Sequence, residues 1–213
     1  FRTITIYLLS YALMVVSSIL SVPILLALGH NRGHRFTFGI GLGGCIPLAG
    51  IKTTVTTHPD FNPDARGVFI QNHVSVFDGS LACRVLPHAF VGLHNKWHRW
   101  VPGYGWFMVI SRSIGVPSSK KGKGRLIEIN RQAKATASRN VSILAFPEGH
   151  RTRDGNIGPF KRGSFLMAQE AGYPVIPMCV RGMWEIESKR GWLIRPGRVD
   201  VYLGAPIDVV GLE

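Results

Sequence analysis

Residues 67–78 read GVFIQNHVSVFD, an apolar run followed at once by polar side chains. The run Gly67–Gln71 has the length and composition of a short buried strand. Val141–Phe146 is a second such run, and Pro147 and Glu148 follow it directly. Because α/β folds place their sites in loops at the carboxyl ends of strands, both following loops are candidate functional sites.

From residue 51 onward, strand-like and helix-like segments alternate. Further strands are expected at Ile51–Thr57, Ala89–Leu93, Ser113–Val116, Pro174–Val180 and Val199–Leu203, and helices at Gly79–Leu86, Lys123–Ser138 and Gly163–Ala171. This alternation predicts an α/β fold with a mixed, largely parallel sheet flanked by helices. The chain has no glycine-rich phosphate loop of the G-x-G-x-x-G or G-x-x-x-x-G-K type.

The first 50 residues are apolar and almost uncharged. Thr3–Gly29 holds no charged residue over 27 positions, a length of about 40 Å as a helix. A glycine-rich uncharged stretch, Phe36–Ile51, follows the polar hinge His30–Arg35, and Pro23 is expected to interrupt the first helix. We predict a membrane-anchoring helical segment over residues 1–50 and a separate α/β domain over 51–213. A cleaved signal peptide and a buried core hairpin are the alternatives.

Charge and apolar residues occupy different parts of the chain. The net charge is +13, and the first 50 residues contribute three arginines and no acid, so +10 belongs to the remainder. The apolar content excludes a disordered basic tail. Three widely spaced cysteines exclude a disulfide scaffold. The positive charge predicts an anionic partner: nucleic acid, phospholipid or a phosphorylated substrate.

Because the chain begins at Phe1 and not at a methionine, we expect further residues upstream.

Two loops carry groups suited to catalysis. A turn can bring Asp78 to His73, where the carboxylate would fix the imidazole tautomer and leave the other nitrogen to accept a proton. The alternative is that Asp78 caps a helix and His73 is an ordinary loop histidine. In the second loop, Glu148, Gly149 and Arg151 combine a carboxylate, a flexible backbone and a guanidinium that can grip a phosphate. The alternative there is a simple turn with a surface ion pair.

Two further segments are less specific. Lys161 and Arg162 precede a predicted helix at Gly163, and cations beside free helix amides favour an anion. Alternatively, both are solvated surface cations. Pro177 lies in an apolar strand and by itself indicates only an edge or core position.

Together these motifs resemble the glycerolipid acyltransferases of the 1-acyl-glycerol-3-phosphate acyltransferase family, over about residues 50–208. The family's N-H-x-x-x-x-D motif matches at Asn72, His73 and Asp78, with Ser75 in a commonly hydroxylated place. Its F-P-E-G-[TS]-R motif matches at residues 146–151, with His150 where the family has Thr or Ser. F-K-[RK]-G matches at residues 160–163, and the V-[IV]-P strand at residues 175–177. An arginine of the second motif is replaced near residues 118–119, with Lys120 and Lys121 just beyond.

The resemblance implies an enzyme that moves a fatty acyl group from acyl-CoA or acyl-acyl carrier protein to the sn-2 hydroxyl of lysophosphatidic acid. His73 would be the general base and Asp78 its partner. The acceptor would be bound by Glu148, Gly149 and Arg151, with Lys120, Lys121, Lys161 and Arg162 as further phosphate contacts. Supporting positions are Asn72, Ser75, Phe146, Pro147 and Pro177. The resemblance implies no bound cofactor, no metal and no acyl-enzyme, and Cys83 and Cys179 are expected to be buried.

The expected partners are a phospholipid membrane, a lysolipid acceptor and an acyl-thioester donor, and not nucleic acid. We expect the protein at an inner or plasma membrane with its catalytic domain on the cytoplasmic side. An aromatic stretch with Trp97, Trp100, Trp106 and Phe107 would lie at that interface or pack in the core. The remaining alternatives are another lysolipid acceptor such as lyso-ornithine lipid, a metal-dependent phosphoesterase, and a non-catalytic basic module for membrane or nucleic acid.

Overall fold

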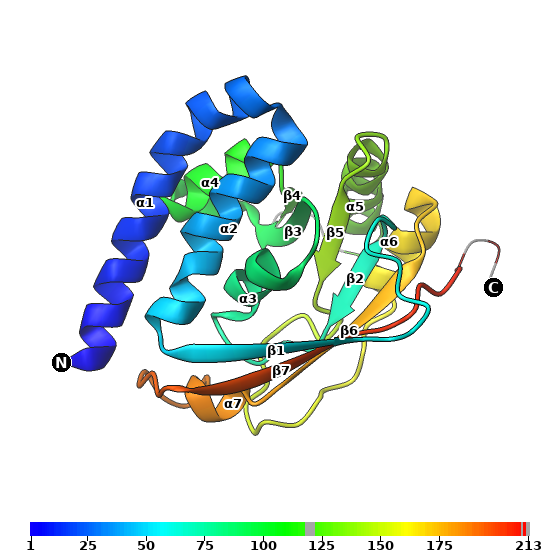
Figure 1. Ribbon diagram of the computed structural model, residues 1–213. Coiled ribbons are helices and arrows are strands. Elements are labelled where there is room, and N and C mark those ends of the chain that lie inside the picture. Colours follow the sequence, from blue (N-terminus) through cyan, green and yellow to red (C-terminus); the bar gives the residue numbers. More distant parts are fainter. Residues whose placement is uncertain (118–121, 210, 212–213) are drawn as a thin grey trace.

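A computed structural model describes residues 1–117, 122–209 and 211 (Figure 1). Its sheet has seven strands in the order β1-β7-β6-β2-β5-β3-β4 within the described residues. Every neighbouring pair is parallel except β6 and β7, which are antiparallel. The strands are β1 (Ile51–Thr57), β2 (Val68–Gln71), β3 (Phe90–Asn95), β4 (Ile114–Val116), β5 (Ser142–Ala145), β6 (Val175–Arg181) and β7 (Gly197–Leu203).

Helices cover both faces of this sheet, which confirms the predicted mixed, largely parallel α/β fold. The helical elements are α1 (Arg2–Leu28), α2 (His30–Leu48), α3 (Asp78–Val85), the 3-10 helix η1 (Lys96–Trp100), α4 (Tyr104–Ile110), α5 (Gly122–Ala137), α6 (Gly163–Ala171) and α7 (Met183–Ile186). No sequence pattern predicted η1, α4 or α7. Each is short. It is stabilised by packing in the folded protein, and it is too short to show a helical repeat of apolar residues in the sequence.

The central strands are buried on both sides. All four residues of β2 and all four of β5 are buried. Side chains alternate between the faces, so Phe69 joins a core with α2 and α3, while Val68 and Ile70 join a core with α5 and α6. This explains why these strands read as continuous apolar runs in the sequence.

The two amino-terminal helices form an antiparallel hairpin that turns at Gly29, where φ is 75°. The hinge expected at His30–Arg35 is therefore wrong, since those residues form the first turns of α2. The expected break at Pro23 is also wrong, because α1 continues through it to Leu28. A proline removes one helical hydrogen bond, and here it lies close enough to the end for the helix to persist.

Glycines in α2 let three helices approach closely. A Cβ at Gly41 would lie 2.7 Å from Cβ of Ser17 on α1, and one at Gly43 would lie 3.3 Å from the backbone of Arg84 on α3. The hairpin also contacts the sheet domain at its start, where Arg2 donates to the carbonyl oxygen of Ile194 and, within the hairpin, to that of Ala49 at the end of α2. The glycine-rich composition of α2 thus follows from helix packing on two sides.

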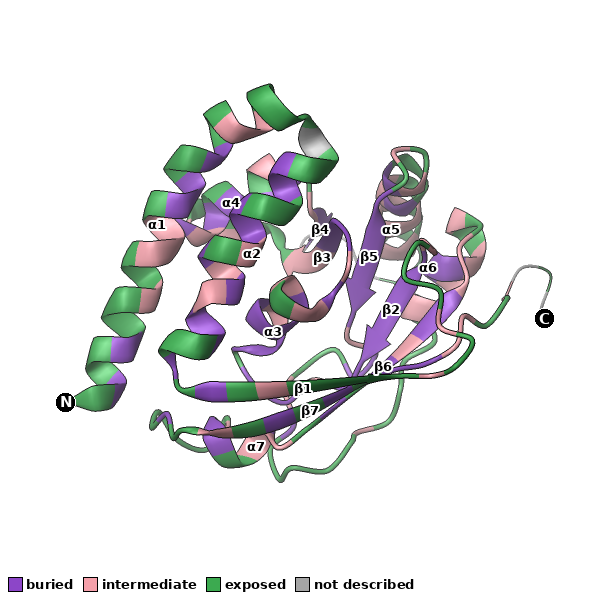
Figure 2. Cartoon of the chain, viewed as in Figure 1, coloured by how far each residue is buried: buried purple, intermediate pink, exposed green. Residues whose placement is uncertain are grey.

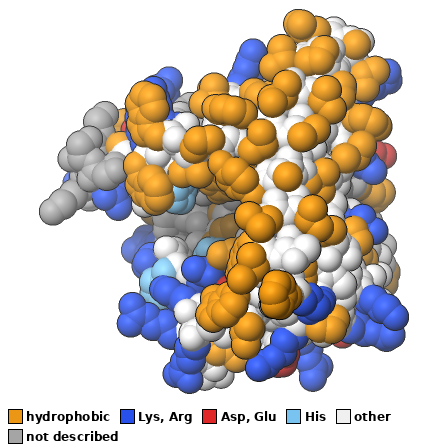
Figure 3. All heavy atoms as spheres, turned by 90° about the vertical axis from the view of Figure 1, so that its left-hand side faces the viewer, with side chains coloured by type: hydrophobic (Ala, Val, Ile, Leu, Met, Phe, Trp, Pro, Cys, Tyr) orange, Lys and Arg blue, Asp and Glu red, His pale blue; other side chains and the backbone are white. Residues whose placement is uncertain are grey.

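The outer side of α1 is apolar and exposed. Leu26 is 83% exposed and Leu8 is 65% exposed, and the burial colouring shows exposed residues along the whole helix (Figure 2). The space-filling view of that side shows hydrophobic side chains gathered over it (Figure 3). Within the described residues, α1 is the one helix long and apolar enough to cross a membrane, with a mean hydropathy of 2.3.

Three tryptophan side chains on η1 and α4 are exposed as well. Trp100 on η1 is 76% exposed, and Trp97 and Trp106 are exposed as well. Only Phe107 of this stretch is fully buried, in a small core with Phe38. Core packing is therefore wrong for the three tryptophans. The expected burial of Cys179 is wrong too, because its side chain points outward from β6.

Gly182 offers a test of how β6 connects to α7. Its φ is 90°, and an added Cβ would lie 2.5 Å from the carbonyl oxygen of Arg198. We expect Gly182→Ala to lower the free energy of unfolding by about 1–3 kcal/mol, measured by denaturant unfolding in detergent. Gly124→Ala in α5 is the control, since its Cβ meets no atom within 4 Å. Equal stabilities of the two variants would contradict the predicted strain.

Candidate active site

The loops that follow β2 and β5 meet at one edge of the sheet because these parallel strands are neighbours. His73 follows β2, and its Nδ1 lies 2.8 Å from Oδ2 of Asp78. Its ring stacks on Phe146, which follows β5, with centroids 4.1 Å apart. The side chain is 24% exposed, and Nε2 has no hydrogen-bond partner in the described part of the chain. An imidazole held in this way presents Nε2 to a reacting group.

Asp78 is completely buried at the start of α3. Its Oδ2 also accepts hydrogen bonds from the backbone amides of Val74, at 2.7 Å, and Ser75, at 2.9 Å. Two amide donors stabilise the carboxylate anion. The carboxylate thus accepts from amides that precede it in the chain and closes the turn between His73 and Asp78. A helix cap would instead accept from the first-turn amides of α3. Nδ1 of His73 then carries the proton that it donates to Asp78.

Glu148 links the two loops. Its Oε1 accepts from the backbone amide of His73 at 2.7 Å, and its Oε2 accepts from the amide of Gly158 at 3.0 Å. The carbonyl oxygen of His73 accepts from the amide of Thr152 at 2.9 Å. Glu148 is buried, with both oxygens engaged. Its contacts hold the backbone of His73, and the acceptor contact that the resemblance implied for Glu148 stays a prediction.

Arg151 lies beside a residue that the sequence analysis missed. Its Nη1 is 3.5 Å from Oε1 of Glu187, a carboxylate just beyond α7. Glu187 is buried and also accepts from the hydroxyl of Ser75 and, at 3.0 Å, from the amide of Val76. Nothing in the sequence marks Glu187, because the three groups that surround it come from distant segments. Arg151 is partly exposed and keeps further donors for a ligand.

Other motif residues serve the backbone around the site. The side chain of Asn72 exchanges two hydrogen bonds with the backbone of Val180, at 2.9 and 2.8 Å, which ties β2 to β6. The carbonyl oxygen of Pro147 accepts from the amide of Lys161 at 2.9 Å, and that of Pro177 accepts from Gly204 at 2.8 Å. These contacts fix the strand ends from which the loops start.

The cations of the site are on its outer side. A Cβ at Gly149 would lie 2.6 Å from Nζ of Lys161, so this ammonium group lies against the loop. The amide of Gly149 donates to the carbonyl oxygen of Phe146 at 3.0 Å, which removes it as a free donor for an oxyanion. Arg162 is exposed before α6. Lys120 and Lys121 lie outside the described residues.

A further group of cations was not singled out from the sequence. Arg153, Lys189 and Arg190 line a cavity of about 290 Å³. Arg153 is two residues beyond Arg151, and Lys189 is two residues beyond Glu187, so the cavity adjoins the ion pair that joins their loops. Positive side chains around a cavity favour an anionic ligand.

The described residues contain no cluster of His, Cys, Asp or Glu suited to a metal ion. Cys83 lies on α3, which begins at Asp78, and it is only partly buried, short of the burial expected from the sequence. Desolvation raises the pKa of its thiol well above its usual range, and such a thiol is a poor nucleophile at neutral pH. Among the side chains that the structure describes at this edge, His73 paired with Asp78 has the geometry of a general base.

Comparison with known proteins gives a consistent result. A model of the Acyltransferase family matches residues 52–181. The 1-acyl-sn-glycerol-3-phosphate acyltransferase of Escherichia coli K12 is 31% identical, over 84% of this chain and 72% of its own length. The mouse 1-acyl-sn-glycerol-3-phosphate acyltransferase alpha is 27% identical, over 92% of this chain and 68% of its own.

Among solved structures, the 1-acyl-sn-glycerophosphate acyltransferase of Thermotoga maritima superposes with a TM-score of 0.71. The alignment covers 98% of this chain and 87% of the other, at 19% identity. At that identity, the similarity speaks for the fold, and it extends over the amino-terminal helices as well as the sheet.

The buried position of Glu187 gives a testable expectation for stability. In Glu187→Ala, the hydroxyl of Ser75, the amide of Val76 and the guanidinium of Arg151 lose their acceptor. We expect the free energy of unfolding to fall by about 1–3 kcal/mol, measured by denaturant unfolding. Glu185→Ala on α7 is the matched control, because Glu185 is exposed. If both variants were as stable as the wild type, Glu187 would not join the loops.

Proposed function

The chain belongs to the Acyltransferase family, and from this premise we propose that it acylates the sn-2 hydroxyl of lysophosphatidic acid to give phosphatidic acid. The acyl group would come from a thioester of coenzyme A or acyl carrier protein. The observation that carries the proposal is the His73–Asp78 pair at 2.8 Å, inside the region that matches the family. Arg151 stands at the same edge of the sheet, where a phosphate would accompany the acceptor.

The mechanism follows from the chemistry of the hydroxyl. An alcohol is a weak nucleophile, so Nε2 of His73 takes its proton as the oxygen attacks the thioester carbonyl. An ester C–O bond forms and the C–S bond breaks. The thiolate leaves with the proton that the imidazolium returns, so the enzyme ends unchanged. No acyl-enzyme and no bound cofactor take part in this scheme.

Asp78 supports the charged state of this cycle. Imidazolium forms beside a buried carboxylate whose Oδ2 already accepts two backbone amides. The carboxylate is thus held in place before the proton moves, and no solvent must reorganise around it. Stacking on Phe146 fixes the plane of the ring. The proposed role of Glu148 is to position His73 through its backbone amide.

We assign the acceptor's phosphate to Arg151, with Lys161 and Arg162 as outer contacts. The contact of Arg151 with Glu187 is long, 3.5 Å, which leaves the remaining guanidinium donors for a phosphate. The cavity lined by Arg153, Lys189 and Arg190 is then available for the thioester donor. Coenzyme A carries phosphates, and a carrier protein presents its thioester on a phosphate-linked arm, so either donor matches this charge.

The amino-terminal segment, residues 1–50, is the proposed membrane anchor, and residues 51–213 the catalytic domain. The exposed apolar side of α1 and the exposed tryptophans Trp97, Trp100 and Trp106 support contact with a bilayer. Both the acceptor and the product are lipids. A site beside the membrane takes up the acceptor without its full transfer into water. We place the catalytic domain on the cytoplasmic side, where acyl thioesters are made.

Substitution of His73 tests the general base. We expect His73→Ala to lower the rate of thiol release from acyl-CoA and lysophosphatidic acid by about 10²–10⁴-fold. The assay uses purified protein in detergent micelles with a thiol-reactive chromophore. His58→Ala, in an exposed turn, is the control and should retain the wild-type rate. A wild-type rate in His73→Ala would overturn the mechanism.

Mass spectrometry of the product, from a panel of lysolipids that includes lyso-ornithine lipid, identifies the acceptor in the same assay. A preferred acceptor without a phosphate would remove the role given to Arg151.

The donor cavity gives a separate expectation. Replacing Arg153, Lys189 and Arg190 together by glutamine should raise KM for acyl-CoA about tenfold. Each exposed ion pair with a phosphate of the donor contributes little by itself, but the three contributions add. KM for lysophosphatidic acid should stay within about twofold. With an acyl-N-acetylcysteamine thioester, which lacks the phosphates, variant and wild type should not differ. The control replaces Lys123, Arg131 and Lys134 on α5. A KM change that persists with the truncated donor would contradict this assignment.

A further inference from the structure

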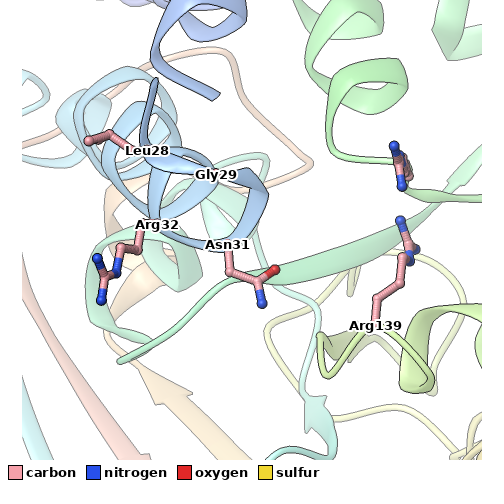
Figure 4. A pocket seen from close by; sticks show the side chains of 6 residues that line it. Leu28, Gly29, Asn31, Arg32 and Arg139 are labelled. Carbon is pink, nitrogen blue, oxygen red and sulfur yellow. The ribbon is translucent and has the colours of Figure 1, made fainter. Parts of the chain in front are cut away.

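A second cavity lies at the turn of the helical hairpin. It measures about 520 Å³ and is lined by Leu28, Gly29, Asn31, Arg32, Arg112 and Arg139. Arg112 comes just before β4, and Arg139 comes just before β5. These strands are parallel to β2, so their first residues lie at the edge of the sheet opposite to His73 (Figures 1 and 4). The cavity is therefore separate from the proposed active site.

The lining is strongly positive. It contains three arginines and no carboxylate among the described residues. Arg139 is held in place, because Nε donates to the carbonyl oxygen of Ala135 at 3.0 Å and Nη2 to the hydroxyl of Thr136 at 3.1 Å. Burial lowers the pKa of Arg139 and the charge of Arg112 lowers it further, yet an arginine stays charged at neutral pH. Like charges held near each other are stabilised by an anion between them.

The start of α2 adds to this positive potential. Its first turn contains no acidic residue, although acids are favoured at a helix amino terminus. Figure 4 shows the side chain of Asn31 reaching from this turn toward the side of the cavity where Arg139 lies, while Arg32 leaves the helix on the other side. An anion in the opening would meet an amide donor, guanidinium donors and the positive end of the helix dipole.

The surroundings indicate what kind of anion would bind. Leu28 lines the cavity, and Leu26 nearby on α1 is the most exposed large hydrophobic residue after Phe1 among those described. Leu28 is itself exposed, so at the end of α1 the cavity lies next to the exposed apolar side chains of that helix. A ligand with a phosphate group next to hydrocarbon chains matches both features.

We propose that this cavity binds the phosphate headgroup of an anionic phospholipid, as a lipid site distinct from the active site. The headgroup would lie between Asn31, Arg112 and Arg139, with its chains beside Leu28 and the end of α1. Such a contact holds the turn of the hairpin at the headgroup level of the bilayer. It makes membrane binding depend on lipid charge and not on apolar area alone.

The test compares two double variants that remove the same charge. Arg112→Gly with Arg139→Gln changes the cavity; glycine suits the positive φ of 56° at position 112, and glutamine keeps an amide donor near Ala135 and Thr136. The control is Arg131→Gln with Lys134→Gln on α5, whose side chains pair with Glu128 and Glu170. Activity in detergent micelles should stay within about twofold in both, which shows that both are folded.

Binding is measured by flotation of purified protein with vesicles of phosphatidylcholine, with and without phosphatidylglycerol. We expect the cavity variant to lose about 30-fold in affinity for the anionic vesicles and little for phosphatidylcholine alone. The control should lose less than threefold. Equal losses in the two variants would mean general charge attraction and would overturn the proposal.

Soluble glycerol phosphate distinguishes the two sources of the anion. If the site takes a lipid, millimolar glycerol phosphate should leave wild-type binding to anionic vesicles unchanged, beyond its effect on ionic strength. If it displaces the wild type from the vesicles but not the cavity variant, the cavity binds free phosphate compounds and the lipid assignment is wrong.

Discussion

Two loops that lie 75 residues apart in the sequence are joined by one buried carboxylate, Glu148. A carboxylate is costly to bury unless donors surround it, and here the backbone amides of His73 and Gly158 supply them. The amide of Thr152 completes the connection by donating to the carbonyl oxygen of His73. Because the backbone of His73 is fixed on both sides, its ring can stack on Phe146 and reach Asp78. The geometry of the proposed base depends on this connection.

A second buried carboxylate, Glu187, makes a similar connection in the carboxyl-terminal part of the sheet. Glu187 joins the turn at Ser75 to Arg151, and it lies just after α7 in the connection between β6 and β7. The antiparallel pairing of these two strands leaves α7 at the same edge of the sheet as the loops that follow β2 and β5 (Figure 1). Glu148 accepts from backbone amides alone, whereas Glu187 accepts from one backbone amide, one hydroxyl and the guanidinium of Arg151.

The separation of apolar and charged residues along the chain becomes a spatial separation in the fold. Hydrophobic side chains gather over the outer side of α1, and the two cavities lined by cations lie elsewhere, one at the turn of the hairpin and one at Arg153, Lys189 and Arg190. The hairpin is not an independent unit, since Ile6, Cys45 and Ile46 pack into the same core as Phe69. The hairpin and the sheet are therefore held together by one shared core.

The sequence by itself determined the α/β class, the strands on either side of the active edge, and the motif residues His73, Asp78 and Arg151, because strand periodicity and short motifs are local properties of the chain. It also showed that residues 1–50 are apolar and that most of the net positive charge lies in residues 51–213. Only the tertiary structure decided that Glu148 serves the backbone, that Glu187 belongs to the site, and that Arg112 and Arg139 share a cavity with the start of α2. The physical reason is that these contacts join segments far apart in sequence, and their partners are fixed by strand order and helix packing, which no local pattern encodes.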